Sequence, residues 1–275
     1  MSRQSRSHRF PVLPMIGTAA LFLLGLCGPA SAQNAAPPAV HVPHTAVTPR
    51  VDGSPNDPAW NSEPLIPSLT LSLGPDAAGL KPQRTSINLT WDEKYLYLRY
   101  TCYDDHIDSK FRHHDDPIYA ADAVELFIDP KGDQREWIEI EVSPNNVVFD
   151  QLAVLTADPV SGPDHVLLPD VLNRDWWMNL SWPLDGLRTA TSRIKENGNV
   201  VGWVADLAVP ADPLLRRLGK KSFEPMTLRA NLLRYDYIKT AGTEKKQLVA
   251  LNWAPVKYGC PHISPEAMGS IVLDR

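Results

Sequence analysis

The fold is decided by residues 123–142, which have the sequence AVELFIDPKGDQREWIEIEV. Two runs in this stretch alternate between apolar and polar side chains with a period of two, which is typical of β-strands. The turn signal PKGD at 130–133 separates them. The pattern therefore predicts an antiparallel hairpin, with one strand at 124–129 and the next at 137–142.

Runs of the same kind extend along the rest of the chain, as in VVGWVA at 200–205, where β-branched and aromatic residues favour a strand. One fragment, at 213–218, is typical of a helix, because Asp212 can cap its start and Gly219 can end it. Further strands are expected at 86–91, 96–102, 187–195, 200–209, 226–236, 247–253 and 269–273. Roughly ten short strands predict an all-β fold, an antiparallel β-sandwich with jelly-roll or immunoglobulin-like layers and one short helix.

The composition limits the class of protein. The chain has 275 residues, of which 43% are hydrophobic, enough for one large domain with a substantial core or for two small domains. Its 26 prolines favour loop-rich β architecture over a mostly helical protein. The formal net charge of −5 argues against a nucleic-acid partner, which would require a basic surface.

Residues 1–32 have the three-part layout of a signal peptide. Three arginines and no acid precede an apolar run at 16–26, and the small residues ASA at 30–32 follow. A membrane anchor is the alternative, but the run is short for a bilayer, and no later segment is long and apolar enough to cross one. A lipoprotein would need a small residue before Cys27, where Leu26 stands. The protein is therefore expected to be secreted or periplasmic.

The remainder is expected to divide into a linker and one domain. Residues 33–45 are rich in proline and alanine, which is typical of a linker, and residues 46–275 form the domain. Export permits a disulfide between Cys102 and Cys260. Because sequence does not show whether two Cα atoms come close, a bridge and two separate thiols both stay open.

The hairpin concentrates carboxyl groups on one face. Residues two apart on a strand point the same way, so Glu125 and Asp129 share a face, as do Glu139 and Glu141. The same face carries two aromatic residues, Phe127 and Trp137. Because aromatic rings lose their burial energy in water, we expect Glu125 and Glu139 to line a groove. Asp129 and Glu141 are expected to lie on a solvated outer face.

Aromatic rings beside carboxylates suit a sugar as the ligand. A sugar ring has an apolar face of C–H bonds, which an aromatic ring covers, and an equator of hydroxyl groups, which carboxylates bind. A buried polar group left unpaired costs about 1–3 kcal/mol, so such a site discriminates between sugars.

Several motifs resemble carbohydrate-binding module family 9, and their order and spacing match over residues 46–275. The resemblance implies a β-sandwich that binds mono- or oligosaccharides, usually as an accessory to glycoside hydrolases. The motifs are VDGSPNDPAW at 51–60, WDEKYLYL at 91–98, YAADAVELFID at 119–129, NWAP at 252–255 and MGSIVL at 268–273.

The resemblance also implies site residues. In the family two tryptophan rings clamp the sugar; here Tyr119 takes the place of one and His262 the place of the other. Glu125 matches a sugar-contacting glutamate, and Asn231 falls where the family often has an amide. Glu139 stands where some members have arginine, which changes the pattern of hydroxyl groups that the site satisfies.

Calcium is a further expectation from the resemblance, because family members often bind it structurally. The acidic pairs at 104–105 and 115–116 can supply oxygen ligands, but neither has the spacing of a D-x-D-x-D-G loop. Solvated turn acids are the alternative for Asp115 and Asp116. The sequence therefore assigns no metal ligands, and the His113-His114 pair is expected at the surface.

Enzymatic hydrolysis of glycosidic bonds is a competing function. It needs two carboxyl groups about 5–9.5 Å apart, one with a raised pKa, and Glu125 and Glu139 are candidates. Nothing in the sequence separates an acid from a nucleophile, and G-x-S-x-G, H-E-x-x-H and phosphate-binding glycine motifs are absent. We therefore expect an exported carbohydrate-binding protein that assists glycoside hydrolases in polysaccharide breakdown, rather than an enzyme.

A role in electron transfer and a purely structural role also stay open. A haem-binding electron-transfer sandwich would show visible absorption, although no C-x-x-C-H motif is present. A structural envelope protein without a ligand would show no thermal shift with any sugar.

Overall fold

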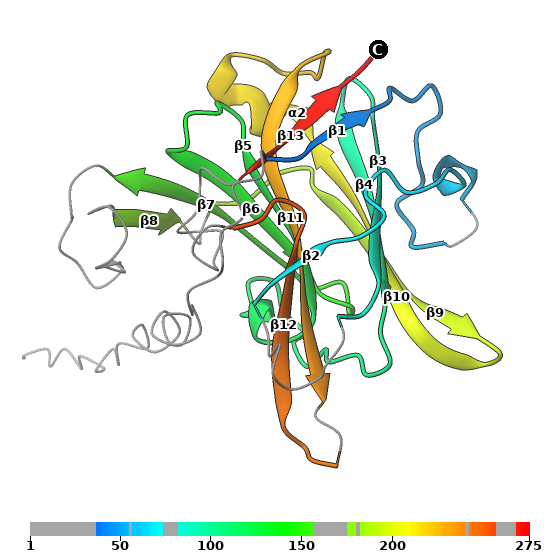
Figure 1. The fold of residues 1–275 in the computed structure, drawn as a ribbon. Coiled ribbons are helices and arrows are strands. Elements are labelled where there is room, and N and C mark those ends of the chain that lie inside the picture. The colour runs from blue at the N-terminus through cyan, green and yellow to red at the C-terminus, as the bar shows by residue number, and fades with distance from the viewer. Residues whose placement is uncertain are drawn as a thin grey trace, which may run out of the picture.

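The structure is a computed structural model that describes residues 37–54, 57–73, 82–156, 175–179, 182–239, 242–256 and 268–275. The predicted signal peptide, together with His262 and Cys260, lies outside the described residues. Two β-sheets pack face to face, with a short helix at one end (Figure 1). Within the described part of the chain, the predicted β-sandwich with one short helix is confirmed.

The larger sheet has nine strands, and all of its pairs are antiparallel except β1 with β13. Along its main path the order is β1 (Ala39–Val42), β13 (Gly269–Leu273), β11 (Thr227–Lys239), β5 (Ala123–Asp129), β6 (Glu136–Val142), β7 (Val148–Thr156) and β8 (Asp175–Asn179). Two strands lie off this path: β12 (Lys246–Asn252) pairs with β11, and β2 (Thr70–Leu73) pairs with β12. The predicted hairpin is thus β5–β6, near the middle of the sheet.

The smaller sheet has four strands, in the order β3 (Thr85–Trp91), β4 (Tyr95–Tyr103), β10 (Asn199–Pro210) and β9 (Arg188–Glu196). Apolar residues from both sheets meet between them; Val124, Leu126 and Ile128 contribute from β5. The hydroxyl group of Tyr100 crosses this core and donates to the carbonyl of Glu125 over 2.7 Å. This bond fixes β5 against the smaller sheet.

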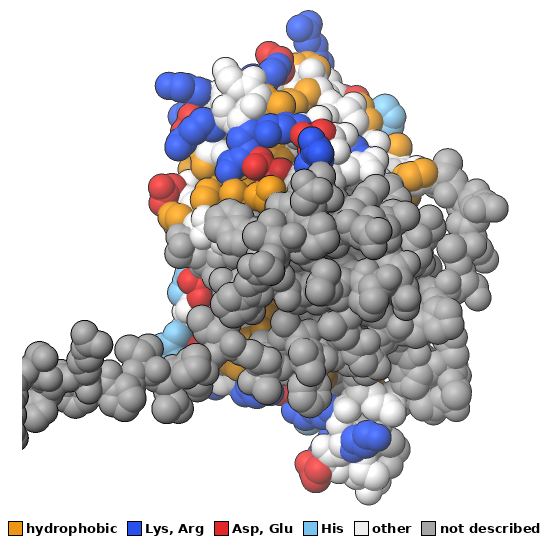
Figure 2. All heavy atoms as spheres, turned by 90° about the vertical axis from the view of Figure 1, so that its left-hand side faces the viewer, with side chains coloured by type: hydrophobic (Ala, Val, Ile, Leu, Met, Phe, Trp, Pro, Cys, Tyr) orange, Lys and Arg blue, Asp and Glu red, His pale blue; other side chains and the backbone are white. Residues whose placement is uncertain are grey.

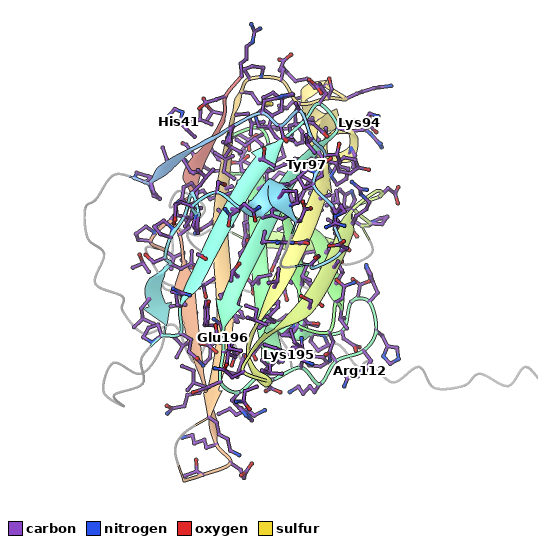
Figure 3. The ribbon with its side chains drawn as sticks, turned by 90° about the vertical axis from the view of Figure 1, so that its right-hand side faces the viewer. His41, Lys94, Tyr97, Arg112, Lys195 and Glu196 are labelled. Atoms are coloured by element: carbon purple, nitrogen blue, oxygen red, sulfur yellow. The ribbon has the colours of Figure 1, made fainter. Side chains whose placement is uncertain are left out.

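The outer face of the smaller sheet is covered by the chain between β1 and β2, including the 3-10 helix η1 (Pro58–Trp60), close to the labelled Tyr97 (Figure 3). Trp60 packs against Tyr97 on β4, and a buried ion pair joins Arg99 to Asp206 over 2.7 Å. Asp206 also accepts a hydrogen bond from the backbone of Gly53. The described part of this face therefore leaves no exposed aromatic surface for a ligand at Trp60 or Tyr97, which are both buried.

The helix begins earlier than predicted. Helix α2 spans Ala211–Leu215 and continues as the 3-10 helix η4 (Arg216–Leu218), which ends at Gly219 with φ +69°. Pro210 occupies the N-cap, so Asp212 lies in the first turn and pairs with Arg216 instead of capping. Among the described residues, no helix has the length and apolar character needed to span a bilayer.

Three features of the structure add to the sequence analysis. The expected linker contains β1, because Val40 and Val42 alternate with the exposed residues Ala39 and His41 and bury against the core. Strands β2, β7 and β8 were not predicted. Of the two alternatives for Cys102, the structure shows a buried free thiol, and burial raises its pKa to about 12.

Candidate functional site

The candidate site is the face of the larger sheet that points away from the smaller sheet. Since Leu126 and Ile140 point into the core, their strand neighbours point to the opposite face. We call this surface the carboxyl–aromatic face. Its members are Tyr119, Glu125, Phe127, Trp137, Glu139, Glu141, Phe149 and Gln151.

Strand register brings the acids of this face together. Glu125 on β5 is the cross-strand partner of Glu141 on β6, and Phe127 is the partner of Glu139. On the far side of β6, Glu139 faces Gln151 on β7. Cross-strand partners have Cβ atoms about 4.5–5.5 Å apart, so three carboxyl groups gather in one small area.

These carboxyl groups are buried. Glu125 and Glu141 are each 1% exposed and Glu139 is 2% exposed. Burial raises the pKa of Glu125 well above its ordinary value, and repulsion from Glu139 raises it further. Burial followed by repulsion from Glu125 does the same for the pKa of Glu141. The prediction that Glu141 lies on a solvated face is therefore wrong, because alternation gives the side of the sheet but not what covers it.

Several oxygens on this face have no hydrogen-bond partner among the described residues: Oε1 and Oε2 of Glu125, Oε2 of Glu141 and Oε1 of Gln151. The amide of Gln151 donates to Glu139. A buried polar atom left unpaired costs about 1–3 kcal/mol. These oxygens are therefore the atoms of the face that a ligand would satisfy.

Tyr119 supplies a phenol ring beside the carboxyl groups. It lies half-buried in the 3-10 helix η3 (Ile118–Ala120), with its ring edge-on to Phe149 at 6.0 Å between centroids. Its carbonyl accepts a hydrogen bond from the hydroxyl of Tyr237 over 3.0 Å. Burial raises the pKa of Tyr119, and Glu141 and Glu139 raise it further. Tyr119 therefore lies in the same environment as Glu139 and Glu141.

Asn231 lies on the same side of the sheet, but its amide is engaged with the backbone. Its Oδ1 accepts from the N–H groups of Leu232 and Ala254, and its Nδ2 donates to the carbonyl of Ala254. Asn231 therefore holds the chain after β12 in place. A direct contact between Asn231 and a ligand stays a prediction, as does any role of His262.

Asp129 ends β5 and stabilises the turn. It is fully buried, and its carboxylate accepts from the N–H groups of Gly132 and Gln134 over 2.7 and 2.8 Å. The prediction of a solvated Asp129 is therefore wrong, because the hairpin turn closes over this carboxylate. Arg229, its cross-strand partner, lies at this end of the face.

A second acidic cluster lies on the side of the larger sheet opposite the carboxyl–aromatic face. Oxygens of Asp104, Asp122 and Asp236 all lie within 4.8 Å of one another, and all three side chains are buried. Arg234 reaches the cluster, with ion pairs to Asp104 over 3.0 Å and to Asp236 over 3.2 Å. Three carboxyl groups thus face one guanidinium group, and the cluster could hold a metal ion.

The donor set of this cluster fits a hard cation, which prefers oxygen ligands. Oδ2 of Asp236 is buried and has no partner among the described residues. Burial and repulsion from Asp104 raise the pKa of Asp122 to about 8, although the backbone N–H groups of Tyr237 and Asp108 bond to its oxygens. Burial also raises the pKa of Asp236 to about 6, against the effect of Arg234. A bound cation would relieve this repulsion.

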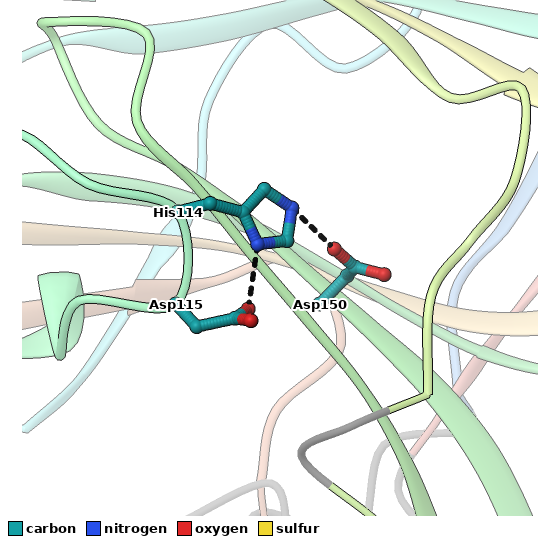
Figure 4. A group of neighbouring side chains, drawn as sticks. All are labelled: His114, Asp115 and Asp150. Atoms are coloured by element: carbon teal, nitrogen blue, oxygen red, sulfur yellow. Dashed lines mark ion pairs between the residues drawn. The ribbon is translucent and has the colours of Figure 1, made fainter.

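His114 bridges two acids, Asp115 and Asp150 (Figure 4). Its Nδ1 lies 3.0 Å from Asp115 and its Nε2 lies 3.1 Å from Asp150. Asp150 is buried on β7 and accepts from the N–H group of Leu184 over 2.6 Å. Each ring nitrogen of His114 contacts a carboxylate. The histidine therefore connects the loop before η3 to β7.

Sequence reasoning missed the contribution of β7 to the site. Gln151 and Phe149 come from this strand, whose sequence VFDQLAVLT does alternate, with Leu152 on the core side. Asp150 is polar, although it lies on the core side of the strand, where the alternation would require an apolar residue. The cluster around Asp236 was also missed, because its members come from three strands or loops far apart in sequence.

Comparison with known proteins relates the chain to a family of carbohydrate-binding domains. Residues 51–161 match the family model described as carbohydrate family 9 binding domain-like. No curated protein sequence matches the chain. The chain carries a carbohydrate-binding module family 9-like domain.

Solved structures share the fold. A family 9 module from Caldicellulosiruptor kristjanssonii in complex with glucose matches with a TM-score of 0.56 at 17% identity, over 86% of this chain and 96% of that one. The same kind of module in complex with cellotriose gives the same score and identity, over 86% and 94%. A putative carbohydrate-binding protein from Bacteroides uniformis gives a TM-score of 0.59 at 14% identity, over 87% and 100%.

Proposed function

We propose that this protein binds a mono- or oligosaccharide on the carboxyl–aromatic face. The observation that carries the proposal is Glu125, whose two buried carboxyl oxygens lack partners within the described residues. Buried oxygens without hydrogen-bond partners lower the stability of the free protein. A ligand that donates hydrogen bonds to them would remove this cost. Sugar hydroxyl groups are donors that can satisfy these oxygens.

The surrounding aromatic residues fit the apolar side of a sugar ring. Phe127 and Trp137 pack together in one cluster on this face, and Tyr119 packs against it. In this arrangement Tyr119 stacks on the ring, while Glu125 and Glu139 accept from its hydroxyl groups. The structural relatives that were solved with glucose and with cellotriose support a saccharide as the ligand class.

Binding fits this geometry better than catalysis. A glycosidase keeps its two carboxyl groups in different states, one protonated and one ionised. Here burial raises the pKa of both Glu125 and Glu141, and no ion pair within the described residues holds either one ionised. We therefore propose a non-catalytic module that is exported and assists glycoside hydrolases.

Calcium is proposed as a structural ion at the cluster of Asp104, Asp122 and Asp236. The unpaired Oδ2 of Asp236, in the described part of the chain, and the excess of three carboxyl groups over one guanidinium support a divalent cation. The ion would join the end of β4, β11 and the segment that leads into β5. It would therefore stabilise the elements that position Tyr119 and Glu125.

The proposal is tested with a glycan array probed by the chain without residues 1–32, in the presence of calcium and of a chelator. Binding to one family of mono- or oligosaccharides is expected, and it should weaken when the chelator removes calcium. Absence of binding to every saccharide in both conditions would overturn the proposed function.

A further inference from the structure

We infer that the carboxyl–aromatic face selects a saccharide that carries a protonated amine, that is, an amino sugar. This inference rests on the proposed function and specifies the chemical class of its ligand. It follows from the donors and acceptors that the face leaves unpaired, and from the charges around them.

When the carboxyl groups are ionised, the unpaired atoms of the face are all acceptors among the described residues. They are the two carboxyl oxygens of Glu125, Oε2 of Glu141 and Oε1 of Gln151. A sugar hydroxyl both donates and accepts, so a surface of acceptors alone satisfies only half of its capacity. An ammonium group has three donors and no acceptor, so it matches such a surface fully.

Two carboxyl groups of the face have no cationic partner among the described residues: neither Glu125 nor Glu141 forms an ion pair there with a Lys, Arg or His side chain. Arg234, the buried cation of β11, points to the other side of the sheet, where it pairs with Asp104 and Asp236. Arg229 lies at the end of the face, beside Asp129 and the turn at Gly132.

Seen from the side of β7 and β8, several Lys and Arg side chains lie at the end of the molecule that carries α2 (Figure 2). There Arg217 and Lys131 form ion pairs with Glu136, which lies at the start of β6. A cationic ligand would supply the positive charge that Glu125 and Glu141 lack among the described residues.

The aromatic members of the face favour an organic cation over a metal ion. An ammonium group and the C–H bonds beside it pack well against aromatic rings, through cation–π attraction and apolar contact. Tyr119, Phe127 and Trp137 provide such rings next to the acids. A metal ion would gain nothing from them, and a neutral sugar would leave the repulsion between Glu125 and Glu141 in place.

The test is calorimetric titration of the mature protein with three sugars of the same ring: glucosamine, N-acetylglucosamine and glucose. N-acetylglucosamine is the matched control, because acetylation keeps the ring and its nitrogen but removes the positive charge. Glucosamine is expected to bind at least about tenfold more tightly than the other two, and added salt should reduce this preference.

Two variants test whether Glu125 and Glu141 cause the preference for glucosamine. Glu125→Gln and Glu141→Gln remove a charge with little change in shape, and each should abolish the preference for glucosamine over glucose. The control Glu196→Gln, on β9 of the other sheet (Figure 3), should keep the preference. Two isosteric variants keep the test valid if one of them fails to fold.

The possible results are distinguishable. Equal affinity for all three sugars overturns this inference and leaves the proposed function standing. Absence of binding to any sugar overturns both. A calcium-induced thermal shift that is lost in Glu125→Gln would show that the face holds a metal ion, and it would also overturn the inference.

Discussion

Glu125 on β5 and Glu141 on β6 are directly opposed cross-strand partners, and the side chain of each is 1% exposed. Two like charges in this position repel each other, and burial disfavours both charged forms. The fold therefore holds protons on this pair at pH values where an exposed glutamate is ionised. Such a pair destabilises the free protein and favours a ligand that donates hydrogen bonds.

Neutralising one partner should therefore stabilise the free protein. Glu141→Gln removes a buried acid whose Oε2 has no partner among the described residues, and its new amide can donate to Glu125. We expect the free energy of unfolding at neutral pH to rise by about 1–3 kcal/mol, measured by urea denaturation. The exposed control Glu196→Gln should change it by less than about 0.5 kcal/mol. A less stable Glu141→Gln would show that the carboxylate is satisfied in the free protein.

Tyr119→Ala should reduce saccharide affinity by about tenfold, because a stacked ring contributes on the order of 1.4 kcal/mol. The loss of stability should be small, since Tyr119 is only half-buried and its hydrogen bond with Tyr237 uses the backbone carbonyl. Titration calorimetry and a thermal melt measure the two effects. Tyr95→Ala is the matched control, because Tyr95 is another half-buried tyrosine, on β4 of the other sheet. Equal affinity losses in both variants would contradict the assignment.

The free energy of unfolding should fall as the pH rises from about 4 to about 8 in the presence of a chelator. The pKa of Asp122 is about 8 in the folded protein against an ordinary value of 3.8. In this window the unfolded chain has lost a proton that the folded protein retains, so the unfolded state binds fewer protons and stability declines with pH. Glu125 and Glu141 act in the same direction. Denaturant titrations at several pH values measure the slope, which should be shallower in Asp122→Asn; an upward slope would refute the account.

Calcium should raise the Tm, and the rise should grow with calcium concentration, because a ligand that binds only the folded state stabilises it by mass action. Asp236→Asn should abolish the effect, since it removes the carboxylate whose Oδ2 has no partner in the described part of the chain. Asp185→Asn, at an exposed turn, serves as the control. A calcium response that survives in Asp236→Asn would place the ion elsewhere.

The sequence predicted the fold well because period-two alternation is strong where one face of a strand is polar, as in β5 and β6. It failed at β7, where Asp150 interrupts the apolar half of the pattern. It also misjudged Asp129 and Glu141, because alternation assigns a side chain to a face and does not show what covers that face. The acidic cluster at Asp236 depends on contacts between distant segments, which a local pattern does not contain.

The most direct test of the central claim is titration calorimetry of the mature protein with cellotriose and with glucosamine, for the wild type, Tyr119→Ala and Tyr95→Ala. The account predicts that the wild type and Tyr95→Ala bind at least one of these saccharides, with affinity at least about tenfold higher than that of Tyr119→Ala. Binding that is unchanged in Tyr119→Ala, or heat of binding that is absent in all three proteins, would contradict it.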